Sequence, residues 1–217
     1  MTTNLGFSAN QIVVPPGQSV LLKDISWLQF EDILLGLGQN RSSRIVYDRG
    51  TLSIMVPLPE HEYFKEAISD LIKDLADELG MDYESYGSTT WRRQRVLGGA
   101  EPDNCFYFQN VAAIRGRTDI NLEQDPPPDL VLEIDITSSS LDSLPIYARL
   151  GIPEVWRYDR KRLIIYHLEK GTHVEAKSSL AFPTFPVQDI PEFINKNSTM
   201  DRRPLRQSFR AWVKQQS

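Results

Sequence analysis

The chain has 217 residues, of which 41% are hydrophobic and 24% are charged, and its formal net charge is −5. This length favours one domain with a sizeable core, and the composition is ordinary for a soluble globular protein. The acidic balance argues against a surface coated with nucleic-acid-binding charge, but it leaves room for a local basic cleft. No apolar run is long enough to span a membrane, so we expect a soluble protein with no membrane partner.

The cysteine content and the N-terminus indicate a compartment. Cys105 is the single cysteine, which excludes an intrachain disulfide and a thiolate zinc site and suits a reducing cytoplasm. Residues 1–4 lack the basic start and apolar core of a signal peptide. We therefore predict a cytoplasmic location.

The first part of the chain predicts an arm, a helix and a hairpin. Residues 1–17 show no period and end in Pro-Pro-Gly, so an irregular arm is expected there. Ser26 is a predicted N-cap for a helix over residues 27–37. Apolar and β-branched residues over 44–47 and 51–56 predict a hairpin around a short polar turn.

A helix over residues 60–79 is the clearest element of the sequence. Prolines end the preceding strand, and Gly80 is the natural stop. The apolar positions recur at helical spacing and are Phe64, Ala67, Ile68, Leu71, Ile72, Leu75 and Leu79. Such a stripe predicts a helix that packs on a sheet.

The middle of the chain predicts short strands and a long loop. Residues 83–86 and 89–95 are strand-like, and the double glycine at positions 98–99 is expected to turn the chain after them. Residues 104–108 predict a further strand. Residues 110–128 show no clear period and end in three prolines, so a loop is expected there.

An apolar run interrupted by acids follows at residues 129–137 and reads as a buried strand. Because side chains alternate across a strand, Leu130, Leu132, Ile134 and Ile136 share one face, and Asp129, Val131, Glu133 and Asp135 share the other. Carboxylates two residues apart on one face of a core strand repel each other and are costly to desolvate. The pattern therefore predicts a cation between them or a site that is open to water.

The last third predicts helices and paired strands. Ser138, Ser139 and Ser140 offer caps for a short helix that begins near residues 142–144 and ends at Leu150. The other predicted elements are a hairpin over 154–158 and 162–168, a strand over 172–177 and a helix over 201–215. We expect a single domain over residues 1–217, with an arm at 1–19, a core at 20–180 and a C-terminal extension at 181–217.

Three segments carry a resemblance to a known family. They are residues 101–103 (Glu-Pro-Asp), 128–133 (Pro-Asp-Leu-Val-Leu-Glu) and 147–156 (Tyr-Ala-Arg-Leu-Gly-Ile-Pro-Glu-Val-Trp). They resemble the Uma2 (Uma-two) family, which is related to restriction endonucleases, and the resemblance covers roughly residues 20–180. It implies an α/β (α+β) fold with the restriction-endonuclease-like core of the PD-(D/E)XK nucleases, a mixed central β-sheet flanked by helices.

The resemblance also implies a metal-dependent active site. Asp103 and Glu133 match the two acids that hold a divalent ion, Mg²⁺ or Mn²⁺, and the carbonyl of Ile134 matches the position that often completes the coordination. Hard oxygen ligands suit magnesium, which lowers the pKa of bound water and stabilises charge on a reacting phosphate. The implied reaction is hydrolysis of phosphodiester bonds in DNA. Because a duplex has two strands, a homodimer is also expected.

The sequence departs from the family pattern at the lysine positions. Asp135 stands two residues after Glu133, where the superfamily has its lysine, and Ser143 occupies a second position where relatives place one. Asp135 is a catalytic candidate as a third metal ligand or as a group that orients water. Positive residues that could substitute for the lysine are Arg149, Lys65, Arg92 and Arg93.

Each candidate also has a simpler explanation. Asp103 suits the entry to a strand, and Asp135 suits a cap for the residues after it. The candidates for substrate binding are His61, Glu62, Arg92, Arg93 and Arg149. An acid at a helix start such as Glu62 interacts favourably with the helix dipole whatever its function, His61 suits a capping role, and arginines on a hairpin are commonly solvated.

Three hypotheses therefore remain. The first is a magnesium-dependent endonuclease that acts on DNA. The second, favoured by Asp135 and Ser143 at the lysine positions, is a catalytically altered or inactive nuclease-fold protein that binds nucleic acid or protein. A hydrolase acting on a non-nucleic phosphate is the third. The sequence contains no recognised base-reading module, so it predicts no sequence-specific recognition.

Overall fold

Two β-sheets organise the chain in the computed structural model, which describes residues 11–38, 41–136 and 141–216. The strands are β1 (Ser19–Leu22), β2 (Arg44–Asp48), β3 (Thr51–Met55), β4 (Glu84–Ser85), β5 (Trp91–Arg93), β6 (Gly98–Ala100), β7 (Asn104–Tyr107), β8 (Leu130–Ile134), β9 (Glu154–Tyr158), β10 (Leu163–Glu169) and β11 (Thr172–Ala176). The helices are α1 (Trp27–Leu37), α2 (Pro59–Glu78), α3 (Val111–Ile114), α4 (Leu144–Leu150), α5 (Ile190–Lys196) and α6 (Arg202–Gln216), with short 3-10 turns η2 (Gln94–Val96) and η3 (Val187–Asp189).

The larger sheet has six strands in the order β11-β10-β9-β8-β7-β4. β8 and β9 run parallel, whereas β7 and β10 pair antiparallel with their outer sides. The predicted α/β class, with a mixed sheet flanked by helices, is thus confirmed. A second sheet of five strands, β1-β3-β2-β6-β5, lies beside it and was not predicted as a separate layer.

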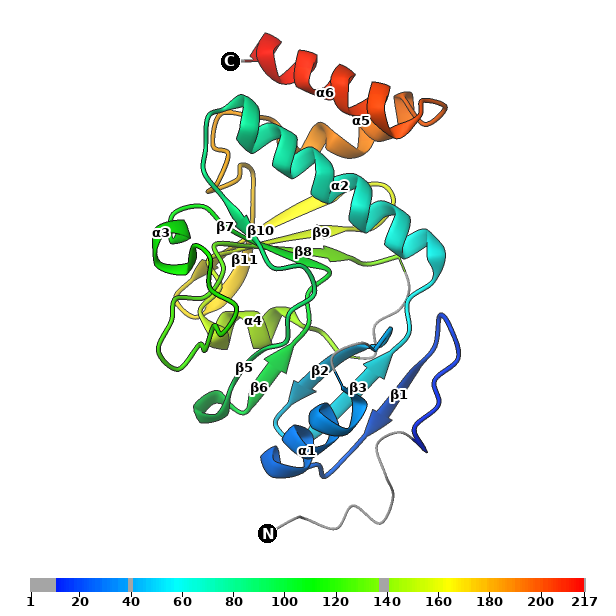
Figure 1. The fold of residues 1–217 in the computed structure, drawn as a ribbon, viewed down its shortest axis with the longest axis vertical. Coiled ribbons are helices and arrows are strands. Elements are labelled where there is room, and N and C mark those ends of the chain that lie inside the picture. Colours follow the sequence, from blue (N-terminus) through cyan, green and yellow to red (C-terminus); the bar gives the residue numbers. More distant parts are fainter. Residues whose placement is uncertain (1–10, 39–40, 137–140, 217) are drawn as a thin grey trace.

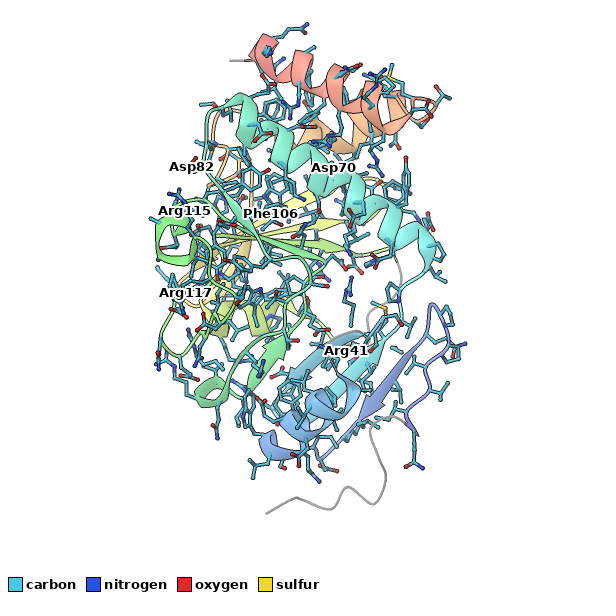
Figure 2. The ribbon with its side chains drawn as sticks, in the orientation of Figure 1. Arg41, Asp70, Asp82, Phe106, Arg115 and Arg117 are labelled. Carbon is cyan, nitrogen blue, oxygen red and sulfur yellow. The ribbon has the colours of Figure 1, made fainter. Side chains whose placement is uncertain are left out.

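Helices cover both sheets (Figure 1). Figure 1 shows α2 lying across the six-stranded sheet, with α5 and α6 beyond it, whereas α1 lies beside the five-stranded sheet at the other end. In Figure 2, Asp70 is labelled on α2 and Phe106 on the sheet that α2 covers. None of the helices in the described ranges combines the length and the apolar composition that a membrane span requires.

The predicted alternation of β8 places its two faces in two different cores. One core joins the sheet to α2, α5 and α6 and contains Leu130, Leu132, Ile134 and Ile136 with Ile68, Leu71, Ile72 and Leu75. Val131 faces the other core, where α4 packs between the two sheets. Both faces of β8 are therefore covered, as expected for a strand with a parallel neighbour.

The core between the sheets contains the single cysteine. Cys105 is fully buried, and its sulfur accepts a hydrogen bond from the indole N–H of Trp91 at 3.3 Å. Burial raises the pKa of the Cys105 thiol to about 12. The residue packs as a small apolar side chain and has no thiolate chemistry at neutral pH.

The predicted helix caps and hairpins are largely confirmed. Ser26 Oγ accepts a hydrogen bond from the N–H of Gln29, and the side chain of Gln29 accepts one from the N–H of Ser26, which forms a capping box. The helices predicted over residues 60–79 and 201–215 correspond to α2 and α6. The caps proposed at residues 138–140 lie outside the described residues.

Two predictions in the middle of the chain are wrong. The segment predicted as a loop contains α3, and the double glycine forms strand β6 between β2 and β5 instead of a turn. A Cβ at Gly99 would lie 3.0 Å from Arg92 Cβ and 3.1 Å from Phe30 Cζ. Glycine is needed here because neighbouring side chains approach the strand closely, not because the chain turns.

Candidate active site

The Glu-Pro-Asp segment links the two sheets. It joins β6 of the five-stranded sheet to β7 of the six-stranded sheet, and both of its acids are buried. Glu101 is bonded within the smaller sheet, where it accepts from the N–H of Ile45 at 3.0 Å and also binds Arg41 and Thr90. Figure 2 labels Arg41 beside this sheet. The link therefore holds Asp103 where the two sheets meet.

Asp103 is held by groups from three elements. Its Oδ2 accepts a hydrogen bond from the N–H of Ile134 on β8 at 2.7 Å, and His61 Nε2 of α2 lies 3.1 Å from the same oxygen. Arg44 Nε of β2 is 3.5 Å from Oδ1, beyond the usual range of a strong N–H···O bond. Oδ1 is therefore the carboxylate oxygen that is less committed to protein donors.

His61 and Glu62 form a charged pair at the start of α2. Burial alone would lower the pKa of His61, but the contact with Asp103 and the carboxylate of Glu62, 3.6 Å from Nδ1, outweigh it and raise the pKa to about 9. The neighbouring His61, supported by Lys65 and Arg44, lowers the pKa of Glu62 to about 2. At neutral pH the histidine is therefore a buried cation that donates to Asp103.

Glu133 faces the same region from the end of β8. Its Oε1 accepts hydrogen bonds from the hydroxyls of Ser143, at 3.1 Å, and Tyr147, both from the α4 segment. Burial and the negative charge of Asp103 raise the pKa of Glu133 to about 8, although these hydroxyls and Arg157 oppose the rise. The negative charge of Asp103 therefore disfavours ionisation of Glu133.

Asp135 follows Glu133 and is bound by an arginine from the next strand. Arg157 Nη2 lies 3.0 Å from Asp135 Oδ2, and its Nη1 lies 3.2 Å from Asp142 Oδ1. Arg157 stands opposite Glu133 in the parallel register of β8 and β9. A guanidinium therefore reaches the site beside the two acids.

Most of these residues line one small pocket of about 50 Å³ at the junction of the sheets. Its lining residues are Arg44, Val46, Met55, His61, Glu101, Asp103, Glu133, Ile134, Asp135, Ser143 and Arg157. A space of this size accepts an ion or a few water molecules but not a nucleotide. The carboxylates that the sequence singled out, Asp103, Glu133 and Asp135, are thus brought together.

The predicted arginines lie elsewhere. Arg92 pairs with Glu31 at 2.8 Å and lines a separate cavity of about 430 Å³. Arg93 donates to the carbonyl oxygens of Leu122 and Leu150, and Arg149 binds Asp48. Lys65 is near the site but binds Glu62 at 2.7 Å.

Sequence reasoning missed the role of four residues that shape the pocket. Arg44 and Arg157 bring positive charge to it, and Tyr147 with Ser143 fixes Glu133. Arg157 had a signal in the sequence, because it stands between the large aromatic residues Trp156 and Tyr158 of a strand. Arg44 had none, since its approach depends on how the two sheets meet.

The donor set fits a divalent ion through oxygen ligands. Asp103 and Glu133 are hard carboxylate ligands that face one pocket, and their repulsion would be relieved by a cation. No cluster of three or more His, Cys, Asp or Glu side chains in the described ranges is placed to hold a metal. The remaining ligands would therefore be main-chain oxygen and water, as magnesium commonly accepts.

Comparisons with known proteins identify a family and distant structural likenesses. The family model Uma2, described as "Putative restriction endonuclease", matches residues 27–194. Among solved structures, the chain is similar to "a putative nuclease belonging to DUF820" from Anabaena variabilis ATCC 29413, with 13% identity and a TM-score of 0.49 over 75% of this chain and 96% of that chain. No curated protein matches this chain.

Proposed function

Because this chain belongs to the Uma2 family of restriction-endonuclease-like proteins, we propose that it is a metal-dependent endonuclease that hydrolyses phosphodiester bonds in DNA. One observation carries the proposal. Asp103, from the link between β6 and β7, and Glu133, from β8, face one pocket of ion-like size that is bordered by Arg44 and Arg157. Phosphoryl chemistry needs this combination of hard oxygen ligands and positive charge.

Asp103, Glu133 and the carbonyl of Ile134 would hold Mg²⁺ or Mn²⁺. When bound, such an ion lowers the pKa of a water molecule and stabilises the charge that develops on the phosphate. The protein keeps the ligands in place. The Ile134 N–H and His61 orient Asp103, and the hydroxyls of Tyr147 and Ser143 orient Glu133.

The reaction consumes one water molecule. The water oxygen bonds to phosphorus, the bond from phosphorus to one deoxyribose oxygen breaks, and that oxygen takes a proton from solvent while the attacking water loses one. The positive groups at the pocket would attract the phosphate into line for this exchange.

The substrate would lie over the mouth of the pocket, because its interior is too small for a nucleotide. The 430 Å³ cavity is lined by Trp27, Arg92 and Thr90, and Thr90 hydrogen-bonds Glu101 of the small pocket. We retain Arg92 as a candidate for contact with a neighbouring nucleotide. Arg93 and Arg149 are committed to protein acceptors and are left out. A homodimer, which would bring two sites to a duplex, remains part of the proposal.

A catalytically altered binding module is the second candidate. The residues at the lysine positions favour it, since Asp135 and Ser143 supply no positive charge of their own. The contacts of Asp103 with His61 and Arg44 also mean that a metal competes with protein cations there.

Calorimetric titration of Mg²⁺ and Mn²⁺, followed by nicking of supercoiled plasmid, tests the proposal. Wild-type protein should bind metal and nick DNA, and Glu133→Ala should lose both. The control is Glu175→Ala, a substitution on strand β11 away from the pocket. Metal binding without cleavage would favour the binding module, and no binding of either ion at millimolar concentration would refute the metal site.

A further inference from the structure

The lysine position of this site carries an acid that holds an arginine. Asp135 stands two residues after Glu133, and its Oδ2 binds Arg157 Nη2 at 3.0 Å. Arg157 comes from β9, the parallel neighbour of β8, and stands opposite Glu133 in register. A positive charge is thus restored beside the acids, but from the adjacent strand.

We propose that Arg157 is a catalytic residue that binds the reacting phosphate, and that Asp135 positions its guanidinium. This inference rests on the proposed nuclease function and names the group that replaces the missing lysine. The substrate group it recognises is a phosphodiester, through the non-bridging oxygens of the phosphate.

The chemistry of the guanidinium supports this role. The contacts with Asp135 and Asp142 use two of its five N–H donors, so others remain to reach a phosphate. The side chain is 20% exposed, which leaves it accessible yet removed from most bulk water. Arginine retains its proton at any physiological pH, so Arg157 stabilises charge and does not accept a proton from water.

The other cations near the pocket are less suited to this task. Arg44 lies beside Glu62, at 3.2 Å, and 3.5 Å from Asp103, whereas Arg157 is the cation whose charge acts on Glu133. Lys65 binds Glu62 and lies near Glu66. A purely structural explanation is that Arg157 ties β9 to Asp142, just before α4. That explanation predicts effects on stability alone, which separates it from phosphate binding.

Two measurements with matched variants distinguish these roles. The first is the affinity for a short fluorescent DNA duplex in EDTA, and the second is plasmid nicking in Mg²⁺. Arg157→Ala should weaken duplex binding about tenfold or more, as expected for a lost charge-assisted hydrogen bond, and should reduce nicking about 10²–10³-fold. The control is Arg162→Ala, which removes a nearby and more exposed arginine that binds Asp159.

A rescue variant adds a result that a structural role does not predict. Asp135→Lys combined with Arg157→Ala places an ammonium at the lysine position and removes the arginine. Nicking should return to within about tenfold of wild type, because a cation again borders the phosphate. Thermal unfolding of each variant shows whether it folds, and Arg157→Gln, which also removes the charge but leaves a smaller gap, replaces Arg157→Ala if that variant does not fold.

Each outcome bears on the inference separately from the nuclease proposal. Wild-type cleavage that persists in Arg157→Ala would overturn the inference and leave the nuclease function standing. Absence of wild-type cleavage, with duplex binding lost in Arg157→Ala but not in Arg162→Ala, would support the phosphate contact and refute hydrolysis. Equal duplex binding by both variants together with a failed rescue would overturn the role of Arg157.

Discussion

Two regions of the molecule bury acidic side chains, and they differ in the groups that contact the carboxylate. Near the C-terminal end of α2, Asp74 is fully buried and is matched by two arginines of α6. Arg206 Nε and Nη2 lie 2.7 and 2.8 Å from its two oxygens, and Arg210 Nε lies 2.7 Å from Oδ1. At the pocket, Glu133 is instead bonded by two neutral hydroxyls and faces a second acid.

The difference shows where the fold is stabilised and where it is strained. The α2–α6 contact satisfies its buried carboxylate with charged, bidentate partners, an arrangement that secures packing. The pocket keeps two acids close together at an electrostatic cost, which a cation from solution would relieve. This contrast favours a structural role for the first cluster and a functional role for the second.

The largest expected effect comes from breaking the matched cluster. Arg206→Ala with Arg210→Ala leaves Asp74 buried without its partners, which should lower the free energy of unfolding by about 3–5 kcal/mol. Urea denaturation measures this change. Arg203→Ala, on an exposed position of the same helix, is the control and should stay within about 0.5 kcal/mol of wild type. A small effect of the double variant would mean that α6 is held by apolar packing alone.

A gain in stability is expected at the pocket. Glu133→Gln removes one of the two repelling acids and keeps an oxygen that can accept from Tyr147 and Ser143. At pH 8 the variant should be more stable than wild type by about 1–2 kcal/mol, which is less than the full pKa shift implies because solvent and relaxation screen the charge. It should also lose metal binding. Lower stability than wild type would show that the acid pair is not strained.

The stability difference between the wild type and Glu133→Gln should depend on pH. The pKa of Glu133 is raised from its ordinary 4.5 to about 8, so between these values the folded state holds more protons than the unfolded state. Stability must therefore fall as pH rises through this window. The advantage of Glu133→Gln should shrink toward zero near pH 5, as measured by denaturation at several pH values.

A second fall in stability with rising pH should be seen in both the wild type and Glu133→Gln. The pKa of His61 is raised from 6.5 to about 9, so its stabilising contribution is fully present below pH 6.5 and is lost as pH rises through about 9. Identical pH profiles for the wild type and Glu133→Gln would contradict the raised pKa of Glu133.

The sequence predicted the elements that have a strong period. The apolar stripe of α2 and the alternation of apolar and acidic residues in β8 were sufficient to predict these elements, because burial of one face imposes such patterns directly. The double glycine of β6 was wrongly predicted as a turn, because the sequence does not distinguish a glycine needed for close packing from one needed for a turn. The separation into two sheets was also missed, since it depends on long-range pairing of β6 with β2.

The site could be predicted only in part for the same reason. Acids in an apolar strand pointed to Glu133 and Asp135, and the family resemblance added Asp103. The arginines that complete the pocket could not be located, because Arg157 depends on the register of β8 with β9 and Arg44 on the junction of the sheets. Site residues that lie on one strand can be predicted from the sequence, whereas residues that come together from different strands cannot.

The buried thiol of Cys105 makes the junction between the sheets observable in solution. Only a thiolate reacts readily with alkylating reagents, and this one is both covered and held in its protonated form. Labelling must therefore wait for the core beside Trp91 to open. Since the chain has one cysteine, the labelling rate reports the opening of this core without any engineered probe.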